Sequence, residues 1–368
     1  QNILKKLKPY PTKLIRKGMD YQYHRFFNQQ ALKGLKNIEK KKGKTNPKFI
    51  RLAKEYANDV LGNEKYSPWL FVYSAVAEEF KEGWIPPNFY GKEVVPRLIG
   101  DYGKISDRNP LTNRLLKINS SLDICYYVNN LFWTTDYSVV NEQDLKELLF
   151  KNNERVVYKK ENTLQGRGIH FFTKENFKIE NIKDIGNGVF QKYIEQHSFF
   201  SLFTQLSVAT IRITSVSDDD GNILIKSTYL RLGKNDDTHV KSASAIKVPV
   251  EIKNGELCED GYFPNWTLTK KHPDNNTTFQ GKTIPFFTSC KSEVIRMHRR
   301  IPFVRCVGWD ITVDNSNQVC LIEWNGGHND IRFNEATQGP CFKELAWEKL
   351  RYNTHNSFYS SALAKVCI

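Results

Sequence analysis

The sequence predicts an α+β protein, and three observations support that fold class. Residues 1 to about 100 have a helical pattern, because apolar residues recur at helical spacing through FIRLAKEYANDVLG and FVYSAVAEEFKEG. From about residue 150 the chain changes to short β-branched and aromatic runs separated by Gly, Asn and Asp. Several of these runs are joined by hairpin turns, such as Asp218 to Asn222 between TIRITSVS and ILIKSTYLRLG. Hairpins favour antiparallel sheets, so a helical region should precede an α+β body.

The remaining elements follow from the same signals. Pro86 and Pro87 break the helical pattern and predict the start of a loop. RVVYKK, GIHFFT and VFQKYI are predicted strands, and VRCVGWDITV and QVCLIEWNG form a further hairpin across Asp314 to Gln318. KELAWEKLRYN predicts a helix near the end of the chain.

Composition limits the protein class. The chain has 368 residues, which suffice for two or three domains, and none of its apolar runs approaches the ~18 residues of a membrane span. Its seven cysteines are scattered singly, without a CxxC pair, which indicates reduced thiols, a cytoplasmic setting and no structural zinc.

The net charge of +14 is concentrated early, in KKLKPYPTKLIRKG and ALKGLKNIEKKKGKTNPK. Two interpretations stay open: these runs are solvated helix faces, or they attract anionic lipid or an acidic glycan. The sequence contains no zinc-finger spacing, RNP-like aromatic strand or helix-turn-helix signal, so we expect no nucleic-acid partner.

The last hairpin carries a candidate metal site. Glu323 and Asn325 are two residues apart in a strand and therefore share a face. Folding across the turn places Asp310 roughly opposite Glu323 on that face. Two carboxylates this close repel unless a cation lies between them, and oxygen ligands suit Mg²⁺ that carries nucleotide phosphates. The alternative is an acidic hairpin edge without a metal.

Three further stretches fit a nucleotide. In VVYKKENTLQGRGIHFF, the turn from Gln165 to Gly168 offers backbone N–H groups to phosphates, and Lys159 supplies a point charge, although GxG in a hairpin can be an ordinary turn. VFQKYIEQH runs from a strand into a linker whose peptide groups suit an adenine edge, with Gln191 as a side-chain acceptor. In SVATIRITS, Arg212 lies among apolar residues and needs a phosphate or carboxylate partner.

In this order and spacing, these elements resemble the ATP-grasp ligases, and within them the sugar-transfer-associated branch found with capsule and surface-polysaccharide genes. The resemblance runs from about Gly83 to Gly339, and its most specific parts are YIEQH followed by ATIRI, and GWDITV followed by IEWNGG. It implies an ATP-grasp fold, in which two α+β lobes hold ATP between them after a helical N-terminal region. The expected divisions are a basic helical region at 1–100, an N-terminal lobe at 101–195 and a C-terminal lobe with the Mg²⁺ site at 196–368.

The resemblance also implies roles for individual residues. Asp310, Glu323 and Asn325 match the magnesium ligands, Arg212 matches the arginine that stabilises the acyl-phosphate, and Arg332 resembles a second anion-binding position. The residues implied for ATP binding are Arg108, Lys159, Gly166, Arg167, Gly168, Gln191, Tyr193 and Ile194.

The function implied is ATP- and Mg²⁺-dependent carboxylate–amine ligation. A uronic acid of a bacterial surface polysaccharide or its nucleotide- or lipid-linked precursor would be the carboxylate donor, and an amino acid or small amine the acceptor. The enzyme would lie in the cytoplasm, with peripheral contact at the inner face of the membrane. Two alternatives stay open: an ATP-grasp kinase that stops at phosphate transfer, and a non-catalytic basic protein that binds glycan or membrane.

Overall fold

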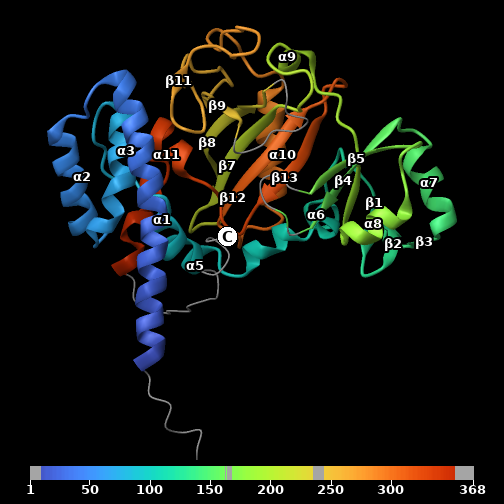
Figure 1. Cartoon of the computed structure of the whole chain (residues 1–368), viewed down its shortest axis with the longest axis horizontal. Helices are drawn as coiled ribbons and strands as arrows, with labels where there is room; N and C mark the ends of the chain where they lie inside the picture. Colours follow the sequence, from blue (N-terminus) through green and yellow to red (C-terminus); the bar gives the residue numbers. More distant parts are fainter. Residues whose placement is uncertain (1–9, 162, 164–167, 235–243, 353–368) are drawn as a thin grey trace, which may run out of the picture. The chain divides into compact units, whose positions relative to one another are not determined.

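The computed structural model describes residues 10–161, 163, 168–234 and 244–352 (Figure 1). These residues form two compact units. One contains the described residues of 1–97 together with those of 330–368, and the other is Leu98–Asn329. The α+β class predicted from the sequence is confirmed: the described residues of the first unit form helices, and the second unit contains two antiparallel sheets together with further helices.

The helical unit is built around α3 (Ser67–Ala77), whose side chains from Trp69 to Val76 are all buried. The long helix α1 (Tyr10–Lys42), α2 (Pro47–Asp59) and α11 (Arg332–Gln338) pack against it. α2 begins where the sequence provides two start signals: the Asn46 side chain accepts from the backbone N–H of Lys48, and Pro47 follows at the first helical position. None of the described helices is long and apolar enough to cross a bilayer.

Two segments of this unit differ from the sequence-based expectation. The loop predicted after Pro86 is helical instead: α4 (Pro87–Phe89), the π-helical turn η3 (Tyr90–Val94) and α5 (Val95–Leu98) follow one another. Pro87 starts this segment because proline is tolerated in a first helical turn. The helix predicted in KELAWEKLRYN is two short 3₁₀ helices, η5 (Lys343–Leu345) and η6 (Trp347–Tyr352), because Ala346 between them is left-handed with φ 51°.

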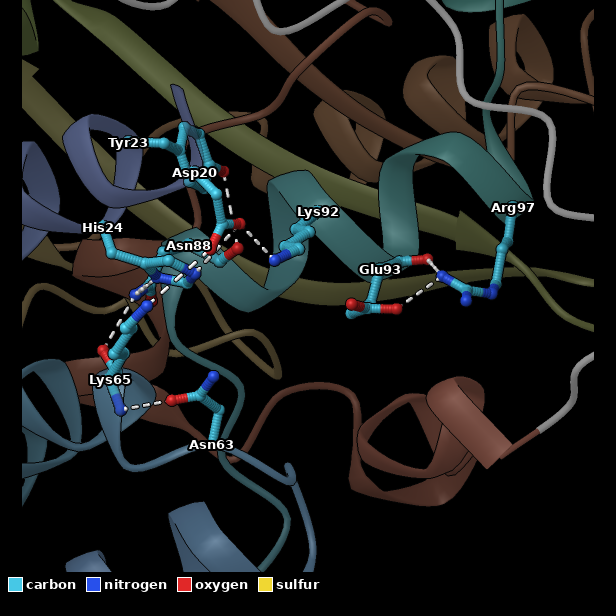
Figure 2. Close-up of polar contacts among 9 residues, drawn as sticks. All are labelled: Asp20, Tyr23, His24, Asn63, Lys65, Asn88, Lys92, Glu93 and Arg97. Atoms are coloured by element: carbon cyan, nitrogen blue, oxygen red, sulfur yellow. Dashed lines mark hydrogen bonds and ion pairs between the residues drawn. The ribbon is translucent and has the colours of Figure 1, made fainter. Parts of the chain in front are cut away.

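A polar network connects α1 with the segments that face it in the helical unit (Figure 2). The Asn88 amide donates to Nδ1 of buried His24 at 3.0 Å and to the backbone oxygen of Lys65, in η2 (Glu64–Tyr66), at 3.1 Å. Lys92 and Lys65 both form ion pairs with Asp20, one turn before His24. Burial lowers the pKa of His24 to about 4, so this histidine is neutral at physiological pH. The network therefore holds α1 by one hydrogen bond to a neutral ring and by two ion pairs to Asp20.

The second unit contains two antiparallel sheets. The six-stranded sheet has the order β3-β2-β1-β6-β4-β5, and the seven-stranded sheet has the order β11-β10-β9-β8-β7-β12-β13. The strands of the first sheet are β1 (Asp123–Val128), β2 (Leu131–Thr134), β3 (Val139–Val140), β4 (Arg155–Lys160), β5 (Ile169–Thr173) and β6 (Gly188–Lys192). Those of the second are β7 (Thr210–Ser217), β8 (Ile223–Leu232), β9 (Ile246–Pro249), β10 (Gly261–Tyr262), β11 (Leu268–Thr269), β12 (Cys306–Val313) and β13 (Val319–Asn325).

Each sheet has its own helical cover. α7 (Glu142–Phe150) and α8 (Ile179–Ile185) close the core of the six-stranded sheet through Leu145, Leu149 and Ile182 (Figure 1). α10 (Phe287–His298) packs on β7, β8 and β12 of the other sheet. Between the first unit and β1 the chain forms η4 (Tyr102–Asp107) and α6 (Asn109–Leu116), and α9 (Ser198–Ser201) follows β6. The lobe boundary near residue 195 falls between β6 and α9 and stays a prediction.

Candidate functional site

The candidate metal residues lie on the hairpin of β12 and β13. The predicted pairing is confirmed: Asp310 lies directly opposite Glu323, and Gly308 lies opposite Asn325. A bulge between Asp310 and Ile311 interrupts the ladder beside this pair. The hairpin therefore brings the two carboxylates to adjacent positions at the middle of two neighbouring strands.

Asp310 is held by two arginines from the adjacent strands. Arg212, on β7, donates from Nε to Oδ1 at 2.5 Å and from Nη2 to Oδ2 at 2.7 Å. Arg231, on β8, donates from Nη1 to Oδ2 at 3.1 Å. All three side chains are buried. Burial alone would raise the pKa of Asp310, but the charges of the two guanidinium groups hold it below its ordinary value. The two arginines therefore favour the ionised form of Asp310.

We call the arrangement of Arg212 and Arg231 around Asp310 the arginine clamp. Asn329 and Gly308 complete it. Nη1 of Arg212 donates to Oδ1 of Asn329 at 3.1 Å, and the Asn329 amide donates to the hydroxyl of Thr214 at 3.1 Å. A Cβ atom at position 308 would lie 2.1 Å from Oδ1 of Asn329 and 3.0 Å from Nη1 of Arg212. Because Asn329 is fully buried and bonded on both sides, only glycine leaves room for it at position 308.

Glu323 differs from Asp310 in its surroundings. Its side chain is exposed, and within the described part of the chain it has no hydrogen-bond partner. Its pKa is nevertheless raised, first because the protein around it limits hydration and second because Asp310 lies opposite. The positive charge of Lys159 acts on Glu323, and its Nζ donates to the backbone oxygen of Ile322, the residue before Glu323, at 2.9 Å. Desolvation lowers the pKa of Lys159. Glu323 is thus accessible and under-neutralised, which suits a ligand that brings positive charge.

A cavity adjoins Glu323 between β13 and the six-stranded sheet. Asp123, Lys159, Gln191, Ile322 and Glu323 are among the residues that line it. Three of the predicted site residues, Lys159 and Gln191 from one sheet and Glu323 from the other, therefore open onto one space.

The predicted adenine segment lies along one wall of this cavity. The Gln191 amide donates to Oδ1 of Asp123 at 2.8 Å, so its nitrogen is already engaged. Burial raises the pKa of Asp123. The Tyr193 ring is covered by the guanidinium of Arg155, whose Cζ lies 3.3 Å from the ring centroid. Past the end of β6, the peptide groups of Tyr193 and Ile194 remain as the groups that could meet an adenine edge.

The predicted phosphate loop is described only in part. Gly166 and Arg167 lie outside the described residues. Gly168 has a φ of +134°, and its backbone oxygen accepts from Lys160 at 2.9 Å, so it closes the turn between β4 and β5. Arg108 is half-exposed, and its guanidinium lies 3.4 Å from the Glu161 carboxylate, next to this turn in the chain.

Arg332 belongs to the helical unit. Its Nε and Nη2 donate to the two oxygens of Asp330 at 2.7 Å each, and Nη1 donates to Gln30 at 2.6 Å. The guanidinium also lies over the ring of Trp69, with 5.7 Å between its Cζ and the ring centroid. It is thus engaged inside that unit, and its anion-binding role stays a prediction.

Three residues of the site were not predicted: Arg231, Asn329 and Asp123. Arg231 has a signal in the sequence, because YLRLG places an arginine among apolar neighbours just as TIRIT does for Arg212. Asn329 and Asp123 lack such a signal, since a short polar side chain at a strand end is common in loops.

The donor set fits Mg²⁺. Glu323 offers a free carboxylate, and Asn325 donates from Nδ2 to the Gly308 oxygen at 3.4 Å, which leaves its Oδ1 as a ligand. Asp310 makes three hydrogen bonds, so about one of the four lone pairs of its carboxylate remains for a cation. Among the described residues, no group of three or more His, Cys, Asp and Glu side chains could hold a metal. Any metal here would therefore depend on two carboxylates, an amide oxygen and ligands from a substrate.

Comparisons with known proteins identify the fold and the family. Among solved structures, the chain resembles N5-carboxyaminoimidazole synthetase from Staphylococcus aureus, with 12% identity and a TM-score of 0.36 over 61% of this chain and 45% of that one. It also resembles the ATP-grasp ligase PsnB bound to a minimal precursor, with 10% identity and a TM-score of 0.41 over 70% and 64%. Biotin carboxylase from Campylobacter jejuni matches with 12% identity and a TM-score of 0.41 over 78% and 53%.

The chain spans less than half the length of the staphylococcal synthetase. No curated protein matches. The family described as sugar-transfer associated ATP-grasp matches residues 110–346, which include both sheets and the whole hairpin of β12 and β13. This match covers well over half of the chain, and the predicted ATP-grasp fold is confirmed. The chain therefore belongs to the sugar-transfer-associated ATP-grasp family.

Proposed function

We propose that this protein is an ATP- and Mg²⁺-dependent carboxylate–amine ligase. The observation that carries the proposal is the pairing of Asp310 with Glu323 beside Arg212, on a cavity that Lys159 and Gln191 also line. In this proposal, the Glu323 carboxylate would meet the metal, Lys159 would meet the phosphates, and the end of β6 at Gln191 would lie toward the adenine. This combination suits a nucleoside triphosphate with its metal better than it suits an acidic hairpin edge.

The roles follow from the positions of the charges. Asp310, Glu323 and Asn325 would hold Mg²⁺, which supplies positive charge to the transferring phosphate. Lys159 would bind the phosphates of ATP in the ground state, since its ammonium lies near Glu323 and donates to only one backbone oxygen among the described residues. Arg212 and Arg231 would neutralise the negative charge that develops when the substrate carboxylate attacks the γ-phosphate. The resulting acyl-phosphate then reacts with an amine, forming an amide and releasing phosphate.

The substrate class we propose is a uronic acid of a bacterial surface polysaccharide or of its nucleotide- or lipid-linked precursor. The family's association with sugar transfer and the chain's net charge of +14 both favour an acidic saccharide. The amine would be an amino acid or another small amine. The second candidate is a kinase of the same fold, because the same charges would also serve simple phosphate transfer.

The product distinguishes these candidates. The full chain would be incubated with ATP, Mg²⁺, a panel of uronates and a panel of amines, and the mixtures would be followed for ADP and by mass spectrometry. Ligation predicts ADP release that needs both substrates and a product with an amide mass. If a phosphorylated sugar forms without amine, the protein is a kinase and the proposed ligase activity is wrong. Glu323→Gln should abolish turnover, whereas the charge-matched surface control Glu180→Gln should retain it.

ATP binding can be tested apart from chemistry. Lys159→Met should weaken ATP binding at least tenfold by calorimetry, because removing a charged phosphate contact costs more than 1.4 kcal/mol. The control Lys183→Met removes an exposed lysine that pairs with Glu142 on the surface. Equal ATP affinity in the two variants would remove Lys159 from the proposed site.

We also propose a peripheral contact between α1 and an anionic membrane surface. Tyr21, Arg25, Leu32 and Lys36 are exposed and recur on one stripe of this helix, so its outer face carries apolar and basic side chains together. Co-sedimentation with vesicles containing anionic lipid should decline as salt rises, and neutral vesicles should not bind. If the same fraction of protein sediments with anionic and with neutral vesicles, the stripe is only a solvated helix face.

A further inference from the structure

Two aromatic side chains meet on the surface of the second unit. Tyr102, in η4, is 68% exposed, and Phe303, in the segment between α10 and β12, is 52% exposed. Their rings pack edge to face, with centroids 5.3 Å apart and an interplanar angle of 61°. Large side chains that contact one another and still face water are characteristic of ligand-binding surfaces.

Both rings are carried by segments that touch the loop after β13. A Cβ atom at Gly103 would lie 2.2 Å from the Gly326 oxygen, so the two backbones approach as closely as glycine permits. The Ser106 hydroxyl joins them by accepting from the Gly326 N–H at 3.2 Å and donating to the Gly103 oxygen at 2.9 Å. Val304, next to Phe303, packs on Gly326 from its own segment.

This anchoring fixes the position of the pair relative to the candidate site. Gly326 directly follows Asn325, on the strand that also carries Glu323. The aromatic pair therefore lies beside the loop that leaves the proposed metal strand, where a substrate could extend from the reacting groups.

The charged side chains close in the chain to the pair are mainly positive. Arg299 and Arg300 follow the last residue of α10 and precede Phe303 by a few residues; both are exposed, and neither forms an ion pair with another described residue. Lys104 follows Tyr102 by two residues and is paired with Asp101 at 2.5 Å. The guanidinium groups of Arg299 and Arg300 can therefore bind an anion, and they lie close in the chain to Phe303 of the aromatic pair.

We propose that Tyr102 and Phe303 form a subsite for one pyranose ring of an acidic saccharide, and that Arg299 or Arg300 binds its carboxylate. A pyranose has an apolar C–H face that packs on an aromatic ring, and guanidinium binds carboxylate in a bidentate manner. A patch of two side chains is far too small for a stable protein interface, which needs about 800 Å² per partner. This inference rests on the proposed function, because it gives the acidic sugar of that reaction a place to bind.

The test is direct binding of a galacturonic acid oligomer to the full chain without ATP. Affinity would be measured by calorimetry, and ring contacts by saturation-transfer NMR. The double variant Tyr102→Ala/Phe303→Ala should bind about tenfold more weakly, a loss of about 1.4 kcal/mol, because both aromatic contacts with the sugar are removed. Phe26→Ala, which removes an exposed aromatic side chain (40%) from α1, should bind as the wild type does.

A second variant tests the charge. Arg299→Gln/Arg300→Gln should reduce the preference for the galacturonic acid oligomer over an uncharged maltose oligomer, without weakening binding of the latter. Because all four side chains are exposed, the thermal midpoints of these variants should match that of the wild type.

The outcomes separate this inference from the proposed reaction. Unchanged affinity in the aromatic double variant overturns the subsite, and so does wild-type binding that does not distinguish acidic from uncharged oligomers. Absence of any amide product together with loss of binding in the aromatic variant refutes the ligase and retains the subsite. Amide formation with an unchanged KM for the uronate in that variant refutes the subsite alone.

Discussion

Each unit of the protein buries a carboxylate, but the two carboxylates are held in different ways. In the helical unit, Glu335 is fully buried and accepts from the backbone N–H groups of Ile85 at 3.0 Å and Cys341 at 2.8 Å. Burial raises the pKa of Glu335 to about 7, in spite of these hydrogen bonds. In the second unit, Asp310 is equally enclosed but is bound by two guanidinium groups, and its pKa is lowered.

The difference shows that hydrogen bonds and charges compensate burial to different degrees. Two neutral amides satisfy the oxygens of Glu335 but do not offset the cost of removing its charge from water. Two arginines do offset this cost for Asp310, because their charges favour its ionised form. A buried acidic residue alone therefore does not mark an active site, and the type of its partners is more informative. Glu335 orders the segments that flank it, and Asp310 organises a charged cluster.

The largest effect on stability is expected at Asp310. Asp310→Asn removes the negative charge and leaves two buried arginines without a counter-ion, which should cost about 3–5 kcal/mol of unfolding free energy. Urea denaturation followed by circular dichroism would measure this cost. A loss below 1 kcal/mol would mean that the arginines are solvated and that the contrast with Glu335 is wrong.

A smaller, pH-dependent effect is expected at Glu335. The ordinary pKa of 4.5 describes the unfolded chain, whereas the folded value is about 7, so the folded state holds a proton over this interval. The stability that this proton gives is complete below about pH 4.5 and is lost as the pH rises through about 7. The wild type should therefore lose about 3 kcal/mol between pH 4.5 and pH 8 relative to Glu335→Gln.

Denaturation of both proteins at several pH values would test this expectation. Glu348 is close to Glu335 and its pKa is also raised, but it titrates in both proteins, so the difference between them isolates position 335. If the unfolding free energies of the two proteins change with pH in the same way, Glu335 is ionised in the folded state.

The smallest effect on stability is expected at Glu323. Because this side chain is exposed and Asp310 repels its charge, Glu323→Gln should change the unfolding free energy by no more than about 0.5 kcal/mol. The same urea titrations would measure it beside Asp310→Asn. A destabilisation close to that of Asp310→Asn would mean that both carboxylates are structural, and the functional distinction between them would disappear.

The sequence predicts the hairpin better than it predicts the contacts across it. Alternating side chains and a turn of defined length determine the register, so Asp310 could be placed opposite Glu323 from spacing alone. The need of a buried arginine for a partner was also predictable for Arg212. Its actual partner, the Asp310 that was expected to serve a metal, was not predictable, because β7 and β12 are far apart in the chain and their pairing is set by tertiary packing.

Local conformation limits prediction elsewhere. The helical pattern of KELAWEKLRYN is genuine, but the left-handed Ala346 divides it into two short 3₁₀ helices. Similarly, Pro86 and Pro87 predict a break, although the second proline starts a helical turn. In both segments the packing of buried side chains such as Trp347 and Phe89 outweighs a local preference.

The missing side chain at Gly308 has a consequence for the evolution of this site. Any mutation there would push a methyl group or more into Asn329 and Arg212, so selection for the arginine clamp is also selection for glycine at this position. In a relative that has lost the arginine clamp, selection would no longer maintain either the clamp residues or glycine at position 308. We therefore expect positions 212, 308, 310 and 329 to be inherited together among relatives, and replacement of Gly308 to accompany loss of the charged cluster rather than to precede it.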